Sequence, residues 1–324
     1  MKKILIFLTI TVLLAACSSD SDPAVTNDGR RVPLQVTGYI ADTPLGITRA
    51  AGSAWDAADQ IGLYAVQSNT TTPIEGGSNV GYVLTGSPGP TNGIDYKVFT
   101  SISTSISMPS EGNIDVYGYY PYNAETTDPT ALAVNLNIQT EQKSVDLMTT
   151  DKEDHTIHGD NTSPSINKVT PSCQLLFHHR LTKLVFNLKA GEDFSSSDIE
   201  GATSLTIGSQ KTTATYNIYT DELTCVGESN QTITAAVGST KSGYEKTFEA
   251  IVLPNDADNN PAIDCKVTIV VDGRSYSFTI IRTGEESNIK VKTVSFFAGY
   301  KYEYNVTVYP FTITVDPDKY TEQW

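Results

Sequence analysis

Hydrophobic and polar residues alternate along most of the chain, which is the pattern of β-strands with one buried and one solvated face. The segments RVPLQVTGYI (31–40), LAVNLNIQ (132–139) and TATYNIYT (213–220) show it clearly. In the first of these, the inward positions are Val32, Leu34, Val36 and Ile40. A long helical stripe is missing, and only EDFSSSDIEGATS (192–204) could form a helical turn. The pattern predicts an all-β fold built from antiparallel sheets.

One hairpin can be assigned residue by residue, in IDCKVTIVVDGRSYSFTII (263–281). Asp272-Gly273 is a strong two-residue turn, because both residue types tolerate the positive φ that such a turn requires. Folding about it pairs Val271 with Arg274, Ile269 with Tyr276, Val267 with Phe278 and Cys265 with Ile280. The last three pairs are apolar and share one face, which supports the register.

The amino terminus predicts export and lipidation. A basic start is followed by a short apolar run, ILIFLTITVLLAA (4–16), that ends directly before Cys17. LLAAC resembles a bacterial lipobox, in which the cysteine is lipidated and becomes the new amino terminus; a secretory signal with a chance cysteine is the alternative. We therefore expect a signal peptide over 1–16, an acidic flexible tether over 17–30, and attachment to the outer membrane through lipid on Cys17.

The remaining 308 residues (324 minus 16) are too many for one typical sandwich. A polar stretch, KEDHTIHGDNTSPS (152–165), precedes a new series of strand patterns that begins near residue 173. We therefore predict two tandem β-sandwich domains, over 31–170 and 171–324.

The charge balance restricts the partners. The formal net charge is −15, and removing Lys2 and Lys3 with the signal peptide leaves 20 basic against 37 acidic residues, or −17. A surface this acidic repels nucleic acid and anionic lipid. Membrane attachment therefore has to come from acyl chains. After Cys17 the chain keeps Cys173, Cys225 and Cys265, which allow one disulfide or none.

Signals for catalysis are weak. His155 and His158 lie in an acidic run, but HxxH without the glutamate of HExxH is a poor zinc signal, and a solvated loop explains it as well. His178 and His179 should lie on opposite faces of a strand. The sequence has no GxSxG elbow, P-loop or GxGxxG after a strand. We expect no metal, no cofactor and no enzymatic activity.

The tyrosine-rich segment YGYYPY (117–122) permits a second function. In a strand Tyr117 and Tyr119 share one face and Tyr120 lies on the other. Exposed tyrosines stack on sugars, whereas buried ones only fill the core. An outer-membrane lipoprotein that binds glycans through Tyr117 and Tyr119 is therefore the alternative hypothesis.

Several motifs occur together in one order. The lipobox is followed by TRA (48–50), then W-x-x-x-D-x-I-G-L-Y (55–64), YGYYPY, VDLMTT (145–150), FHHRLTKLVFNL (177–188) and AGYKYEYNVTVYPFTITV (298–315). This series resembles the fimbrillin family of lipoprotein-derived pilus subunits, including the Mfa-like proteins. The resemblance implies two transthyretin-like β-sandwich domains and an arginine-directed protease that removes the first strand together with the lipid. The vacated groove then accepts an extended segment of the next subunit, and the subunit can be a shaft, tip or anchor component.

The residues fit this scheme in two places. Pro33 cannot donate to a ladder, which favours an edge position for 31–40, and an edge strand can be lost without dismantling a sheet. If residues 32–40 were paired on both sides in mid-sheet, polymerisation by loss of an expendable strand would be contradicted. Arg49 follows this strand among small residues, so it is the candidate cleavage site, with an ordinary surface-loop arginine as the alternative.

A candidate donor segment lies near the carboxyl terminus, where Phe311, Ile313 and Val315 alternate after Pro310. The same residues could instead form the last strand of the second domain, because periodicity does not distinguish the two. The expected partners are other pilus subunits, in a homopolymer or a heteropolymer, the outer membrane, and a ligand on a host or bacterial surface.

Overall fold

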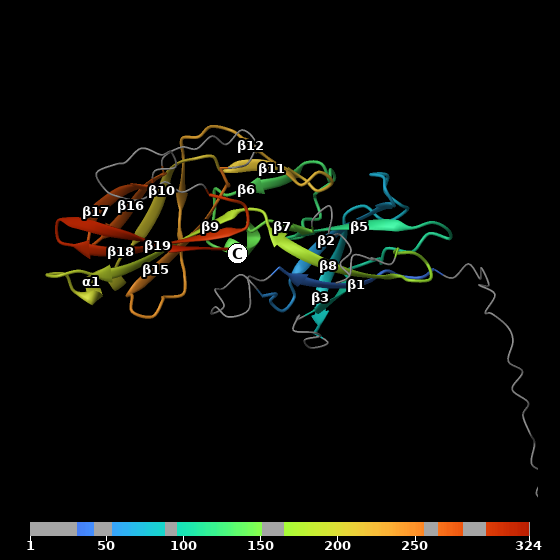
Figure 1. Ribbon diagram of the computed structural model, residues 1–324, viewed down its shortest axis with the longest axis horizontal. Coiled ribbons are helices and arrows are strands. Elements are labelled where there is room, and N and C mark those ends of the chain that lie inside the picture. Colours follow the sequence, from blue (N-terminus) through green and yellow to red (C-terminus); the bar gives the residue numbers. More distant parts are fainter. Residues whose placement is uncertain are drawn as a thin grey trace, which may run out of the picture. The chain divides into compact units, whose positions relative to one another are not determined.

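The computed structural model describes residues 31–41, 54–87, 96–150, 165–255, 265–280 and 296–323 (Figure 1). Within these ranges nearly every regular element is a strand, and the helices are the short η1 (Gln142–Ser144) and α1 (Ser196–Glu200). The all-β prediction is confirmed. The predicted lipidation at Cys17, the tether, the cleavage at Arg49 and the pair His155 and His158 lie outside the described residues.

The first group of strands closes into a barrel, in the order β1-β4-β3-β2-β5-β7-β8. Its strands are β1 (Gln35–Ile40), β2 (Gln60–Gln67), β3 (Val80–Gly86), β4 (Lys97–Ser101), β5 (Ile114–Tyr120), β7 (Met148–Thr150) and β8 (Ser172–His179). The parallel pairing of β1 with β8 completes the closure. This differs from the antiparallel sandwich expected for this part of the chain.

The remaining strands form three further sheets. One has the order β14 (Ala236–Val237), β15 (Lys246–Val252), β9 (Thr182–Ala190), β18 (Tyr300–Tyr309) and β19 (Thr312–Gln323). Another has the order β13 (Gln231–Thr234), β10 (Ser204–Gln210), β16 (Cys265–Val271) and β17 (Arg274–Ile280). The third has the order β12 (Glu222–Val226), β11 (Thr213–Asn217) and β6 (Leu132–Asn135). The transthyretin-like assignment of the two domains stays a prediction.

The division of the chain differs from the predicted boundary after residue 170. Strand β8 closes the barrel although it follows that boundary, and β6 pairs with β11 of the later group although it precedes it. The polar stretch that suggested the boundary lies between β7 and β8, which are neighbours in the barrel. A polar connection marks a loop, and here the loop joins two strands of one sheet.

Two buried clusters make up the core, and β2 and β5 supply both. Alternate residues of a strand point to opposite faces, so β2 sends Ile61 and Leu63 into the barrel interior and Tyr64 into the cluster shared with the later sheets. In β5, Tyr120 joins the barrel cluster, whereas the second cluster receives Tyr117 and Tyr119. Both faces of these strands are therefore covered.

The hairpin prediction is confirmed at every pair. Cys265 lies opposite Ile280, Val267 opposite Phe278, Ile269 opposite Tyr276 and Val271 opposite Arg274. The turn residues Asp272 and Gly273 have φ of 46° and 71°. The predicted helical turn is α1, whose N-cap Ser195 forms a capping box with Asp198.

Candidate functional site

Strand β1 is central in its sheet, so the predicted edge position is wrong. Residues Val36, Thr37 and Gly38 pair with β4, and Gln35 through Ile40 pair in parallel with β8. Pro33 misled the prediction because it lies before the strand, where it forms only an isolated bridge to Ser107. The ladders begin at Gln35, so the missing N–H of Pro33 is not needed.

The inward positions of this strand are as predicted. Leu34, Val36 and Ile40 are 4%, 3% and 6% exposed, and Val32 packs partly buried against the same cluster. We call the space that β1 occupies the β1 slot. Its walls are β4 and β8, and its apolar lining includes Phe99, Cys173, Leu175 and Phe177.

Backbone hydrogen bonds hold both ends of the segment in the slot. The N–H of Leu34 donates to the carbonyl of Ile106 at 2.8 Å, and the carbonyl of Val32 accepts from Met108 N–H at 2.8 Å. At the other end, Ala41 N–H donates to the Phe177 carbonyl at 2.8 Å. The slot therefore fixes the register of its strand from residue 32 to residue 41.

Gly38 is the narrow point of the β1 slot. A Cβ atom on Gly38 would lie 3.2 Å from a ring carbon of Phe177 and 3.3 Å from a ring carbon of Phe99. Both rings are buried, at 0% and 3% exposure. The edges of Trp55 contact both of them, with ring centroids 5.2 Å apart in each pair. The glycine therefore fills a position that is closed by the rings of Phe177 and Phe99, and Trp55 packs against both rings.

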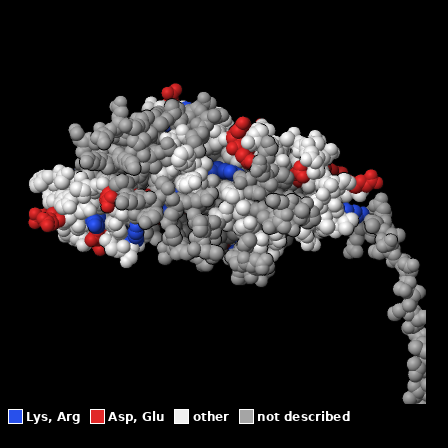
Figure 2. Space-filling model, in the orientation of Figure 1, with Lys and Arg blue, Asp and Glu red and all other residues white. Residues whose placement is uncertain are grey.

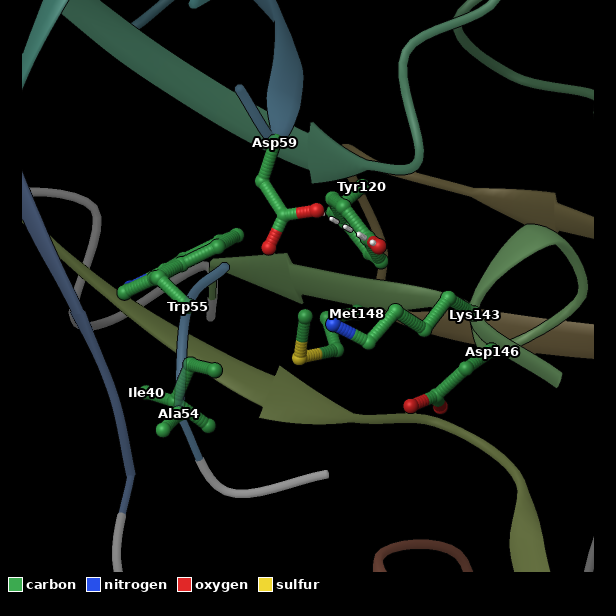
Figure 3. A pocket seen from close by; sticks show the side chains of 8 residues that line it. All are labelled: Ile40, Ala54, Trp55, Asp59, Tyr120, Lys143, Asp146 and Met148. Carbon is green, nitrogen blue, oxygen red and sulfur yellow. Dashed lines mark hydrogen bonds between the residues drawn. The ribbon is translucent and has the colours of Figure 1, made fainter. Parts of the chain in front are cut away.

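A small cavity lies next to the Ile40 end of the slot (Figure 3). Its lining residues are Ile40, Ala54, Trp55, Asp59, Tyr120, Lys143, Asp146 and Met148. The Asp59 carboxylate accepts the N–H of Asp56 at 2.7 Å and the hydroxyl of Tyr120 at 3.3 Å. Burial raises the pKa of Asp59 above its ordinary value. Trp55 and Asp59 of the W-x-x-x-D motif thus hold the turn before β2 against the slot.

The candidate donor segment lies mostly in β19, an outer strand of the five-stranded sheet. Ile313 and Val315 are half-buried against the second core cluster, while Phe311 lies in the β18–β19 turn and is 95% exposed. Phe311 therefore does not share the inward alternation that the sequence suggested. Within this chain the segment forms the last strand, and a donor role would require β19 to leave β18.

The alternative hypothesis, that Tyr117 and Tyr119 are exposed and bind glycans, is wrong. Tyr117 and Tyr119 are 7% and 3% exposed, and Tyr120 is 6% exposed. The hydroxyl of Tyr119 donates to Asn79 Oδ1 at 2.6 Å, and the ring of Tyr117 packs edge-on against Tyr219. These tyrosines belong to the core, so stacking on a sugar has no basis here.

The structure describes two of the four histidines and the three later cysteines. His178 and His179 alternate on β8 as predicted, and Nδ1 of the buried His179 lies 3.0 Å from Asp146 Oδ1. No group of three potential metal ligands occurs among the described residues. Cys173, Cys225 and Cys265 are buried, and none of them forms a disulfide with another described cysteine. Burial raises the pKa of Cys173 to about 12.

The location of Cys173 is a feature that the sequence did not reveal. It lies opposite Val36 in the parallel ladder, and both side chains are buried in the barrel cluster. The hydroxyl of Thr37 donates to its carbonyl at 3.2 Å. Strand β1 therefore covers this thiol directly, and no local signal could have indicated a pairing across so long a separation in sequence.

The described residues form no basic patch on the face shown in Figure 2. There the described Asp and Glu side chains are dispersed among uncharged residues, and the described Lys and Arg side chains form no continuous area. Among the described residues no helix is long and apolar enough to cross a membrane.

Comparisons with known proteins agree with these features. A model described as fimbrillin-like matches residues 48–324, and one for the prokaryotic membrane lipoprotein lipid attachment site matches residues 1–18. The chain is 30% identical over 308 residues to a candidate fimbrium subunit of Bacteroides uniformis, Fim1C, a match that covers 93% of this chain and 88% of the relative.

Two crystal structures resemble the fold. A candidate cell adhesion protein from Bacteroides uniformis has a TM-score of 0.64 and 25% identity, with 92% of this chain and 99% of that chain covered. One from Bacteroides ovatus has a TM-score of 0.63 and 18% identity, with 91% and 98% covered. At 18% identity, the likeness to the Bacteroides ovatus protein is a likeness of fold alone.

Proposed function

The chain belongs to the fimbrillin-like family, and from this premise we propose that it is a structural or adhesive subunit of a fimbrium on the bacterial surface. It is a cell-surface lipoprotein, and we propose that Cys17 carries the lipid and that the attachment is to the outer membrane. The observation that carries the proposal is the family match over 48–324 together with the lipid attachment site. The proposal assigns it no enzymatic activity.

We further propose that the subunits join by strand exchange at the β1 slot. Cleavage after Arg49 would release Cys17 with its lipid and, in the same piece, the strand that carries Val32, Leu34, Val36 and Ile40. A strand from a neighbouring subunit would then pair with β4 and β8 by β-augmentation. The buried side chains of such a strand contribute about 1.5–3 kcal/mol each before ordering costs.

Because β1 is paired on both sides, it cannot be lost as an expendable edge strand, and the exchange has to proceed by direct replacement. An edge strand could leave at little cost, but an empty β1 slot would expose Phe99 and Phe177 and leave β4 and β8 each unpaired along one side. Unpaired backbone groups away from water are costly. The incoming strand therefore has to replace β1 as it leaves, and the completed joint is held by two ladders rather than one.

The donor that this chain would contribute to the next subunit is its own carboxyl-terminal segment, with Phe311, Ile313 and Val315 as the alternating residues. β19 is an outer strand, so it can separate from β18 without parting any other pair of strands. The β18–β19 turn is anchored to β17, since the Pro310 carbonyl accepts from Arg274 Nη1 at 3.1 Å and from the Tyr276 hydroxyl at 3.3 Å, and both hydrogen bonds would have to break for the segment to leave.

Amino-terminal sequencing of fimbriae sheared from cells tests the proposal. We expect subunits that begin at Ala50, and we expect Arg49→Lys to abolish this start because the protease recognises arginine. Arg31→Lys is the matched control and should not change the start. Assembled subunits that still begin at acylated Cys17 would contradict strand exchange at this slot and would favour an anchor or a plain lipoprotein.

A further inference from the structure

We propose that the β1 slot accepts a strand from a different subunit and rejects the carboxyl-terminal strand of a second copy of this chain. The selection is by side-chain size at the position of Gly38. This inference rests on the proposed strand exchange, because it specifies which strand the exchange can use. It makes this chain a member of a heteropolymer at its β1 slot.

The walls around Gly38 leave no room for a larger residue. The Cβ distances of 3.2 Å and 3.3 Å to Phe177 and Phe99 already require a small shift for alanine. Neither ring can turn away freely, because Trp55 packs edge-on against both and is itself 8% exposed. Overfilling such a packed site is destabilising, and a branched or aromatic side chain would have to displace the rings.

The other inward positions of β1, in contrast, require large side chains. Leu34, Val36 and Ile40 fill the barrel interior, so small residues there would leave cavities. The fitting strand therefore carries large apolar residues at three inward positions and glycine at the position of Gly38. At the inward positions 34, 36, 38 and 40, the required side chains are therefore large, large, glycine and large.

The carboxyl-terminal segment of this chain does not meet that order in any register. Residues 311–324, FTITVDPDKYTEQW, contain no glycine, alanine or serine. Aligning Ile313 with position 34 and Val315 with position 36 places Pro317 at position 38. Proline adds a ring at the narrow point and cannot donate a backbone hydrogen bond. A strand inserted in the reverse direction places Phe311, Ile313 or Val315 there instead.

Peptide binding to the cleaved protein tests the inference. The purified full mature chain is treated with an arginine-specific protease, and mass spectrometry confirms cleavage after Arg49. Fluorescent peptides are then titrated: the native segment 31–41, its variants Gly38→Ala, Gly38→Val and Gly38→Leu, and the segment 310–324 with and without Pro317→Gly. The native peptide with Gln35→Val is the matched control, since Gln35 is exposed on the outer face of β1.

We expect the native peptide and its Gln35→Val control to bind alike. Gly38→Val and Gly38→Leu should bind about tenfold more weakly or worse, with Gly38→Ala between them and the native peptide. The segment 310–324 should also bind at least about tenfold more weakly than the native peptide, and Pro317→Gly should recover part of that loss.

The outcomes that overturn the inference are separate from those that overturn strand exchange. If the native peptide binds but affinity does not depend on size at position 38, or the segment 310–324 binds as tightly, selection by Gly38 is wrong and strand exchange stands. If the native peptide does not bind, or cannot displace β1 from the cleaved chain, the exchange itself is contradicted, and the inference with it.

Discussion

Release of β1 should convert Cys173 from a protected thiol into a reactive one. The perturbation is cleavage after Arg49 followed by loss of the strand, which uncovers the side chain that lies opposite Val36. In the intact chain burial raises the pKa of Cys173 to about 12. Only the thiolate reacts with the usual thiol reagents, so the pKa change adds to the change in access.

The magnitude follows from the two pKa values. At pH 8 a thiol with a pKa of about 12 is thiolate in about 1 molecule in 10,000, whereas an exposed cysteine with a pKa of about 8.5 is thiolate in about a quarter of molecules. The thiolate fraction therefore rises on the order of a thousandfold. The lower intrinsic nucleophilicity of the exposed thiolate reduces the gain in rate to roughly tens-fold to a hundredfold, before access is counted.

The assay is maleimide labelling at pH 8, followed by mass spectrometry of the labelled peptides before and after release. Cys225 and Cys265 are internal controls, because both are buried in the other core cluster and should stay unlabelled. Adding the peptide 31–41 should protect Cys173 again. Equal labelling rates before and after verified loss of β1, or simultaneous labelling of all three cysteines, would refute the assignment of β1 as the cover of the slot.

Three further predictions concern stability. Ile40→Ala should lower the free energy of unfolding by about 2–5 kcal/mol in urea, whereas Gln35→Ala on the outer face should change it by less than about 0.5 kcal/mol; equal effects would contradict the inward placement of Ile40. Gly273→Ala should cost about 1–2 kcal/mol, because its φ is 71°, and Gly86→Ala, where a Cβ has room, is the control. Burial raises the pKa of Asp59, so its contribution to stability is full below the unfolded pKa of about 3.9 and is lost as pH rises through the higher folded pKa. Asp59→Asn should therefore become more stable relative to the wild type as pH rises from about 4 in urea titrations, and a constant difference would contradict this.

The features that could be predicted from the sequence are those with local causes. The 265–280 hairpin has its register fixed by one turn, and the alternation of Leu34, Val36 and Ile40 shows which side of the strand is inward. The partners of β1 had no such signal, because β4 and β8 are distant in sequence and the pairing with β8 is parallel. Pro33 even suggested the wrong position, since a proline just outside a ladder looks the same in sequence as one on an edge.

The buried tyrosines show the same limit for the site. The spacing in YGYYPY correctly separates Tyr117 and Tyr119 from Tyr120, but it does not reveal that a second layer covers the outer face of β5. Whether Gly38 is a flexible point or a narrow one also depends on Phe99, Phe177 and Trp55, which three separate segments bring together. Such packing is a property of the assembled barrel and cannot be derived from any one stretch.

The pairing of β6 with β11 has a consequence for how relatives of this chain can recombine. A single crossover between two genes near residue 180 would join the barrel of one parent to the later sheets of the other. Leu132 and Val134 would then come from the first parent while the strand they must match, with Ala214 and Tyr216, came from the second. Working hybrids should therefore inherit the stretch around 132–135 together with the later half, as a mosaic rather than a simple exchange of ends.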